Sequence, residues 1–242
     1  MFGNQNHSNS VSADNTPLCE LHIQSNTKKG SQIKFRECCY TITRADCYKK
    51  TWRDKPLKAL FFLYEGYVDW EISILSYILN VTGVEINTTA LNDEVTHKGT
   101  FKVKLDINIE ACNPNNYDAL IIPGGEPDPF IKDERVLNLV REFDDQGKVI
   151  SAICGGTTFL AAAGVLRERK YSTSIDDDLA YKHYFNEAFK SETDVTVCEN
   201  LITAEGNAYV EFAVAVGKRL GIFKDREDEL ETVLFFKNQL RG

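Results

Sequence analysis

The chain has 242 residues, a length that suits one large domain and excludes several full ones. Hydrophobic residues make up 43% and charged residues 26%, so a packed core is expected and a wholly disordered chain is excluded. The net charge of -8 argues against broad nucleic-acid binding. No apolar stretch approaches the about 18 residues of a membrane span, so no membrane association is expected.

The charge divides the chain into two parts. Residues 1–56 hold nine Lys or Arg and five Asp or Glu, a balance of +4, whereas residues 57–242 hold nineteen and thirty-one, a balance of -12. The first part is also rich in Asn, Ser, Thr and Gln and poor in aliphatic residues. It is therefore predicted to be a polar N-terminal extension, disordered over roughly its first 18 residues, that precedes an α/β domain at 57–242.

The cysteines indicate the compartment. The chain has seven, an odd number, and its start, MFGNQNHSNS, lacks the basic-then-apolar pattern of a secretory signal. Free thiols in a reducing cytoplasm are therefore expected. A zinc site at Cys38, Cys39 and Cys47, with Cys19 and His22 nearby, is not predicted, because adjacent cysteines suit one tetrahedral site poorly and no C-x₂-C pair occurs.

Buried strands alternate with helices from residue 57 onward. In chain order the expected elements are a strand at 58–64, a helix capped by Asp69, a strand at 84–91, an antiparallel strand or hairpin arm at 100–109, a strand at 118–123, a helix at 133–143, a strand at 148–153, a helix at 157–166, two short strands at 195–204, and helices at 210–220 and 227–240. This alternation predicts an α/β three-layer sandwich around a mostly parallel sheet. Functional sites in such sheets gather at the carboxyl ends of the strands.

The segment VISAICGGTTFLAAAGVL has the layout of a nucleophile elbow. A buried strand ends at Ile153, Cys154 follows at once, and Gly155 and Gly156 lead into a helix. The tight turn would strain the backbone of the nucleophile and require small neighbours. The helix N-terminus is expected to lower the pKa of the thiol, and the Gly155 N–H is expected to face a forming oxyanion. A buried structural cysteine is the plainer alternative.

Two more strand ends carry candidate site residues. In IIPGGEP, Gly124 and Gly125 follow a buried strand and offer backbone N–H groups to an anion or carbonyl, although an ordinary turn would look the same. In YEGYVDWE, Glu71 opens a helix at the same edge of the sheet. Close to the thiol its pKa should rise, so that the carboxyl could donate a hydrogen bond to sulfur. The alternative is a glutamate that merely favours the helix N-terminus.

Together ALFFLYEGYVDWE, YDALIIPGGEPDPF, VISAICGGTTFLAAAGVL and ENLITAEGNAYVEFAVAVGKRLG resemble the ThiJ/PfpI superfamily, which is related to class I glutamine amidotransferases. The similarity is greatest to the bacterial branch whose elbow reads AICG. The resemblance implies a flavodoxin-like fold, a homodimer, and a Glu from the first helix placed against the elbow cysteine, which maps onto Glu71. No cofactor and no metal are predicted.

The sequence departs from that family in its histidines. Protease-like and amidotransferase-like relatives carry a His after the Cys, but here the next residue is Gly155. The deglycase and chaperone branch has a His that corresponds to about Ser174, and the His-x-Glu of true amidotransferases is missing. The only His after Cys154 is His183, in a segment that looks helical. His183 is a candidate base, although a surface or packing role is the simpler interpretation.

Three functions follow as hypotheses. The first is a small-molecule enzyme in which the Cys154 nucleophile and the Glu71 acid act on a reactive carbonyl or similar electrophile. The second is a non-catalytic redox, stress-sensing or chaperone-like protein with an oxidisable Cys154. The third, a glutamine amidotransferase, is disfavoured by the missing His. Cys112 and Cys198 are expected to be structural, with Cys112 as an alternative resolving thiol.

Overall fold

The computed structural model describes residues 55–175 and 180–239. Nearly all of the predicted N-terminal extension lies outside these residues, and so do the four cysteines and the histidine weighed as zinc ligands there. No helix in the described ranges is long and apolar enough to cross a membrane.

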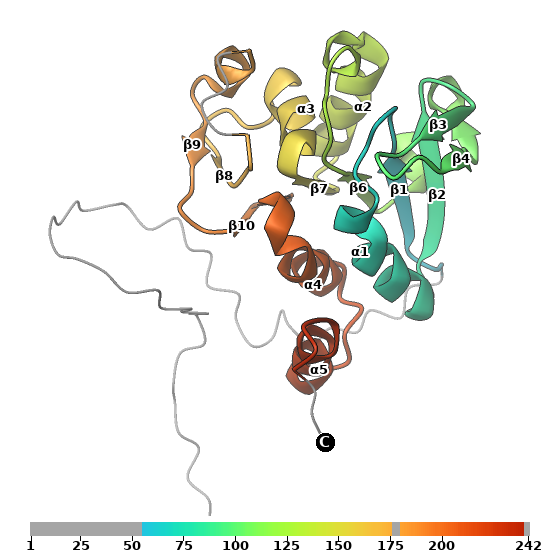
Figure 1. Cartoon of the computed structure of the whole chain (residues 1–242), viewed down its shortest axis with the longest axis vertical. Coiled ribbons are helices and arrows are strands. Elements are labelled where there is room, and N and C mark those ends of the chain that lie inside the picture. Colours follow the sequence, from blue (N-terminus) through green and yellow to red (C-terminus); the bar gives the residue numbers. More distant parts are fainter. Residues whose placement is uncertain (1–54, 176–179, 240–242) are drawn as a thin grey trace, which may run out of the picture. The chain divides into compact units, whose positions relative to one another are not determined.

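A seven-stranded sheet forms the centre of the domain, with the strand order β10-β11-β7-β6-β1-β2-β5 (Figure 1). Its strands are β1 (Lys58–Phe62), β2 (Glu85–Ala90), β5 (Ile107–Asn108), β6 (Ala119–Ile122), β7 (Val149–Ile153), β10 (Val195–Cys198) and β11 (Leu201–Ala204). All neighbours run parallel except β10 and β11, which form the hairpin predicted at 195–204. The mostly parallel sheet expected from the sequence is confirmed.

Helices cover both faces of the sheet (Figure 1). On one face α1 (Trp70–Val81) packs against α4 (Tyr209–Leu220), and α5 (Arg226–Phe236) packs on α4. On the other face lie α2 (Glu134–Asp145) and α3 (Thr157–Ala162). Strands that are covered from both sides must be apolar along their whole length, which is why they appear in the sequence as continuous apolar runs. The predicted flavodoxin-like three-layer sandwich is the observed fold.

One aliphatic row runs across four strands in the core of the sheet. Leu60 of β1 pairs with Leu120 of β6, which pairs with Ile150 of β7, and Leu201 of β11 continues the row. Each of these side chains is at most 1% exposed. Burial of one such side chain contributes about 1.5–3 kcal/mol, so this row fixes the register of the four strands whose ends carry the candidate site.

Three predicted elements differ in detail, and the first is the helix expected at 227–240, which is α5 and ends at Phe236. The helix expected at 157–166 is shorter: α3 ends at Ala162, and Gly164 follows in the left-handed region with φ +81°, which ends the helix. The segment 100–109 divides, because β4 (Lys102–Lys104) pairs antiparallel with β3 (Glu94–Thr96) in a separate small sheet, while β5 joins the main sheet in parallel.

Asp69 stands at the N-cap position of α1 but does not cap it. Its side chain makes no cap hydrogen bond, and one of its oxygens lies 3.1 Å from Nδ1 of the buried His97. The predicted capping role is therefore wrong. Nδ1 of His97 accepts a 2.9 Å hydrogen bond from the Gly99 N–H, so the loop that follows β3 lies against the start of α1, the part of the helix that carries Glu71.

Candidate active site

Four strand ends meet at one edge of the sheet. Strands β11, β7, β6 and β1 are neighbours and run parallel, so the segments that follow their carboxyl ends lie side by side. These segments bring together Glu71 after β1, Gly124 and Gly125 after β6, Cys154 after β7, and Gly206 after β11. The sequence predicted three of the four, and Gly206 was missed although it also follows a buried strand.

Cys154 has the strained backbone that an elbow requires. Its φ is +54°, in the left-handed region that side-chain-bearing residues rarely adopt. The next two residues must be glycines. A Cβ on Gly155 would collide with the carbonyl oxygen of Gly125, and one on Gly156 would lie 2.7 Å from the carbonyl oxygen of Ile122. The strained turn and the need for small neighbours are as predicted.

Gly155→Ala is expected to lower the free energy of unfolding by about 1–3 kcal/mol. The new methyl group would meet rigid backbone rather than a flexible side chain. The matched control is Gly66→Ala. Gly66 has φ +77° but open space where a methyl group would lie, so its cost is only that of backbone strain, about 1 kcal/mol. Urea unfolding of both variants makes the comparison, and equal losses would contradict the close packing of elbow and PGG turn.

Glu71 is buried against the thiol, as predicted. It is 2% exposed, its Oε2 accepts a 2.7 Å hydrogen bond from the Gly124 N–H, and its carboxyl hydrogen-bonds with the Cys154 side chain. This arrangement corrects the expectation for Gly124. Its N–H orients Glu71 and is not available to a substrate oxyanion.

The electrostatics of the pair differ from expectation in one respect. Burial, followed by the charge of Glu71, raises the pKa of Cys154 to about 11, although the Gly155 N–H and Ser174 act in the opposite direction. The net shift is therefore upward, opposite to the lowered thiol pKa that the sequence predicted, because desolvation outweighs the Gly155 N–H at the helix start.

Burial also raises the pKa of Glu71, as predicted, and the Gly124 N–H and the thiol partly offset this rise. The hydrogen bond between the two side chains lowers the pKa of Glu71 and raises that of Cys154. These are the signs of a thiol that donates to a carboxylate. These directions favour a proton on sulfur, whereas the sequence predicted a protonated Glu71.

Gly206 completes the wall beside the pair. A Cβ on this residue would lie 2.7 Å from Oε1 of Glu71 and 3.3 Å from Sγ of Cys154. The Gly206 N–H donates a 2.7 Å hydrogen bond to Oγ of Ser174, and Ser174 acts to lower the pKa of the Cys154 thiol. Ser174 thus occupies the place where the family resemblance locates a histidine in other branches.

Two threonines hold the carbonyl of the elbow. The hydroxyls of Thr157 and Thr173 lie 2.7 and 3.1 Å from the Cys154 carbonyl oxygen and 2.6 Å from each other. Both side chains are buried. Thr157 at the start of α3 and Thr173 in the 171–175 segment therefore hold the left-handed turn at Cys154 from two sides.

Tyr64 is a further residue that the sequence reasoning missed. It lies at the end of the apolar run of β1, is 2% exposed, and donates a 3.1 Å hydrogen bond to the carbonyl oxygen of Pro123. Burial raises its pKa, and the charges of Glu71 and Cys154 add to this rise, so the phenol stays neutral. Its position next to the PGG turn, rather than any motif, is the signal that could have revealed it.

The structure places His183 away from the pair. It lies on an exposed 3₁₀ turn, Lys182–Phe185, instead of the expected helix, and its ring contacts Tyr184. In the described ranges, the groups that act on the Cys154 thiol are Glu71, Gly155 and Ser174, and His183 is not among them. This arrangement gives no support to the candidate base.

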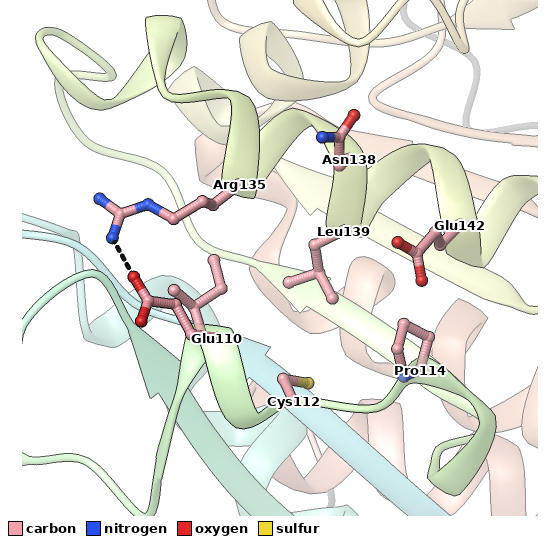
Figure 2. A pocket seen from close by; sticks show the side chains of 8 residues that line it. Glu110, Cys112, Pro114, Arg135, Asn138, Leu139 and Glu142 are labelled. Atoms are coloured by element: carbon pink, nitrogen blue, oxygen red, sulfur yellow. Dashed lines mark hydrogen bonds and ion pairs between the residues drawn. The ribbon is translucent and has the colours of Figure 1, made fainter.

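Cys112 and Cys198 also lie apart from Cys154. Cys198 ends β10, and Cys112 lines a separate cleft of about 210 Å³ between α2 and the segment before β6 (Figure 2). The cleft is bounded by Leu139 and Glu142 of α2, and none of its lining residues belongs to the site around Cys154. Burial and the charge of Glu142 raise the pKa of Cys112 to about 11, which disfavours a role as an exchanging thiol.

Comparison with known proteins finds relatives with names. The chain is 31% identical over 177 residues to an uncharacterized protease, YoaZ, of Bacillus subtilis, covering 69% of this chain and 84% of that protein. It is 32% identical over 127 residues to a deglycase of Pyrococcus horikoshii, covering 51% and 76%.

Among solved structures, a DJ-1 superfamily protein of Agrobacterium tumefaciens superposes with a TM-score of 0.67 at 30% identity, covering 75% of this chain and 98% of that one. Residues 57–219 match the DJ-1/PfpI family, and this range contains every residue of the site described above. The chain belongs to the DJ-1/PfpI family.

Proposed function

We propose that this protein is a cysteine-dependent enzyme that acts on small reactive carbonyl compounds such as glyoxals. The observation that carries the proposal is the buried Glu71 carboxyl hydrogen-bonded to a thiol on a strained elbow. A thiol with its own proton acceptor can attack an electrophilic carbon without being ionised beforehand. The family relatives that bear the name deglycase fit this class of substrate.

The first step is the addition of the Cys154 sulfur to the aldehyde, and Glu71 carries the thiol proton to the aldehyde oxygen. Sulfur attacks the aldehyde carbon of the substrate, an S–C bond forms, and the C=O π electrons move to oxygen. The thiol proton passes to Glu71, which then donates it to that oxygen and gives a neutral hemithioacetal. Glu71 thus acts as base and then as acid, and its raised pKa suits both roles.

The whole reaction needs only water. With methylglyoxal, the hydrogen on the aldehyde carbon is removed as a proton and a proton is added to the neighbouring carbon, which converts the hemithioacetal into a thioester of lactate. Water then hydrolyses the thioester and returns the thiol. The aldehyde carbon is oxidised while the ketone carbon is reduced, so the electrons balance without an external oxidant.

Backbone N–H groups are available for the oxyanion. The Gly155 N–H lies at the sulfur, and the Gly125 N–H has no acceptor among residues 55–175 and 180–239. The two glycines are in close contact, because a Cβ on Gly155 would collide with Gly125. Two N–H groups next to the nucleophile match the requirement for stabilising an oxygen that becomes negative.

Two other functions receive less support. Amide hydrolysis needs a group that protonates a leaving amine, and a histidine is not among the described partners of Cys154. Ready oxidation of sulfur needs thiolate, and a thiol pKa of about 11 leaves little of it at neutral pH. Addition of sulfur to a carbonyl carbon releases no leaving group. Glu71, which already lies beside the sulfur, can take the thiol proton in this step.

Incubation of the full chain with methylglyoxal and enzymatic measurement of lactate test the proposal. We expect lactate to form in proportion to protein concentration and over many turnovers. Loss of methylglyoxal without lactate would indicate mere scavenging by thiols and would reject the proposed reaction.

A further inference from the structure

The cleft between α2 and the segment before β6 has a volume of about 210 Å³ and shares no residue with the candidate active site (Figure 2). Its floor is apolar, because the buried side chains of Ile109, Pro114 and Leu139 line it, and the half-buried Cys112 lies among them. A water molecule takes about 30 Å³ of liquid, so the cleft has room for about seven non-hydrogen atoms. Such a floor favours a ligand with a hydrocarbon body.

The charged side chains at the two ends of this cleft differ in their pairing. At one end, the guanidinium of Arg135 is already engaged by two carboxylates. It donates to Glu110 at 2.8 Å and to the two oxygens of Asp133 at 3.0 and 2.8 Å. At the other end lies Glu142 of α2, whose carboxylate has no hydrogen bond or ion pair in the described part of the chain (Figure 2). The free charge at the cleft is therefore negative, which favours a cationic ligand over an anionic one.

The neighbouring groups do not supply that cation. Lys148 donates to the carbonyl oxygen of Pro114 at 2.5 Å, but it does not line the cleft, and no ion pair joins it to Glu142 within the ranges that the structure describes. A metal ion fits poorly, since no group of three or more His, Cys, Asp or Glu among the described residues could hold one. An organic cation needs only one carboxylate and an apolar surface, and the cleft offers both.

We propose that this cleft binds a small primary aliphatic ammonium ion. The hydrocarbon chain lies on Leu139 and the rest of the apolar floor, and the ammonium group donates hydrogen bonds to the Glu142 carboxylate. Hydrogen bonds between two charged groups are stronger than those between neutral groups, so the charge of the ligand selects it over an alcohol of the same size. Binding is non-covalent, involves no residue of the candidate active site and does not rest on the proposed function.

Protection of Cys112 from a thiol reagent tests the proposal in the full chain. The probe is n-hexylammonium, which matches the size of the cleft, and the rate at which methyl methanethiosulfonate modifies each cysteine peptide is followed by mass spectrometry. We expect about 20 mM hexylammonium to slow the modification of Cys112 about fivefold, as a Kd of about 5 mM requires. Cys198, which ends β10 and does not line the cleft, should react at an unchanged rate in the same sample. At the same concentration 1-hexanol and hexanoate should each slow Cys112 less than about twofold.

Glu142→Gln removes the charge and keeps the shape, so it should reduce protection by hexylammonium to the level of 1-hexanol. Each rate is compared with that of the same variant without ligand. The matched control is Glu134→Gln, also exposed on α2, which pairs with Arg141 at 3.0 Å and does not line the cleft. It should keep the fivefold protection. A cleft that holds only water would leave Cys112 unprotected. That result, equal protection of Cys198, stronger protection by hexanoate, or undiminished protection in Glu142→Gln would overturn the proposal.

Discussion

Cys154→Ala is expected to reduce lactate formation from methylglyoxal by at least about a thousandfold, to the rate of the reaction in buffer. The sulfur is the only atom of the described site that is suited to forming a bond with an aldehyde carbon, and the neighbouring groups act only through it. Alanine at φ +54° keeps the strain that cysteine already bears, so the domain should remain folded. Lactate assays and circular dichroism on the same sample separate loss of chemistry from loss of structure.

The controls are Cys112→Ala and Cys198→Ala. Both residues are half-buried free thiols in the same domain, and neither belongs to the site. They should keep near-wild-type turnover. Retained turnover in Cys154→Ala, or an equal loss in either control, would show that a different thiol or none carries the reaction.

Glu71→Gln is expected to change thiol reactivity and turnover in opposite directions. The negative charge of Glu71 and its hydrogen bond both raise the pKa of Cys154 above its usual range. A neutral amide removes that charge, so the thiol pKa should fall and alkylation at pH 8 should become about tenfold faster or more. Turnover should nevertheless fall about a hundredfold or more, because the amide cannot take and return the proton.

Glu126→Gln is the matched control for this change. Glu126 follows the PGG turn, is exposed, and pairs with Lys98 at 3.1 Å rather than with the thiol. It should leave both measurements unchanged. If Glu71→Gln slowed alkylation, or accelerated both alkylation and turnover, Glu71 would not be the group that accepts the proton of Cys154.

Much of the fold and of the site follows from local chemistry in the sequence. Apolar runs such as 118–123 can only be strands covered on both faces, and parallel strands place their carboxyl ends together. The elbow at Cys154 was predictable because a strand, a nucleophile and two glycines in succession leave the backbone little choice. Glu71 was placed correctly through the family resemblance, which supplied what its position at a helix start could not.

The predictions that differ from the structure concern contacts between segments that are far apart in the chain. The pKa of Cys154 is set by burial and by Glu71, and neither can be judged from a cysteine beside a helix start. The Gly124 N–H serves Glu71 rather than a substrate only because α1 brings the carboxyl within 2.7 Å. The hydrogen bond from the Gly206 N–H to Ser174 likewise joins residues that are 32 positions apart in the sequence.

The central claim is that Glu71 and burial keep the proton on Cys154 until a substrate is attacked. The pH dependence of Cys154 alkylation in the full chain, quantified on the Cys154 peptide by mass spectrometry, tests it most directly. The rate should still rise about tenfold per pH unit between pH 8 and pH 10, as a thiol pKa of about 11 requires. A plateau already reached below about pH 8.5, the ordinary pKa of a thiol, would mean a preformed thiolate and would contradict the account.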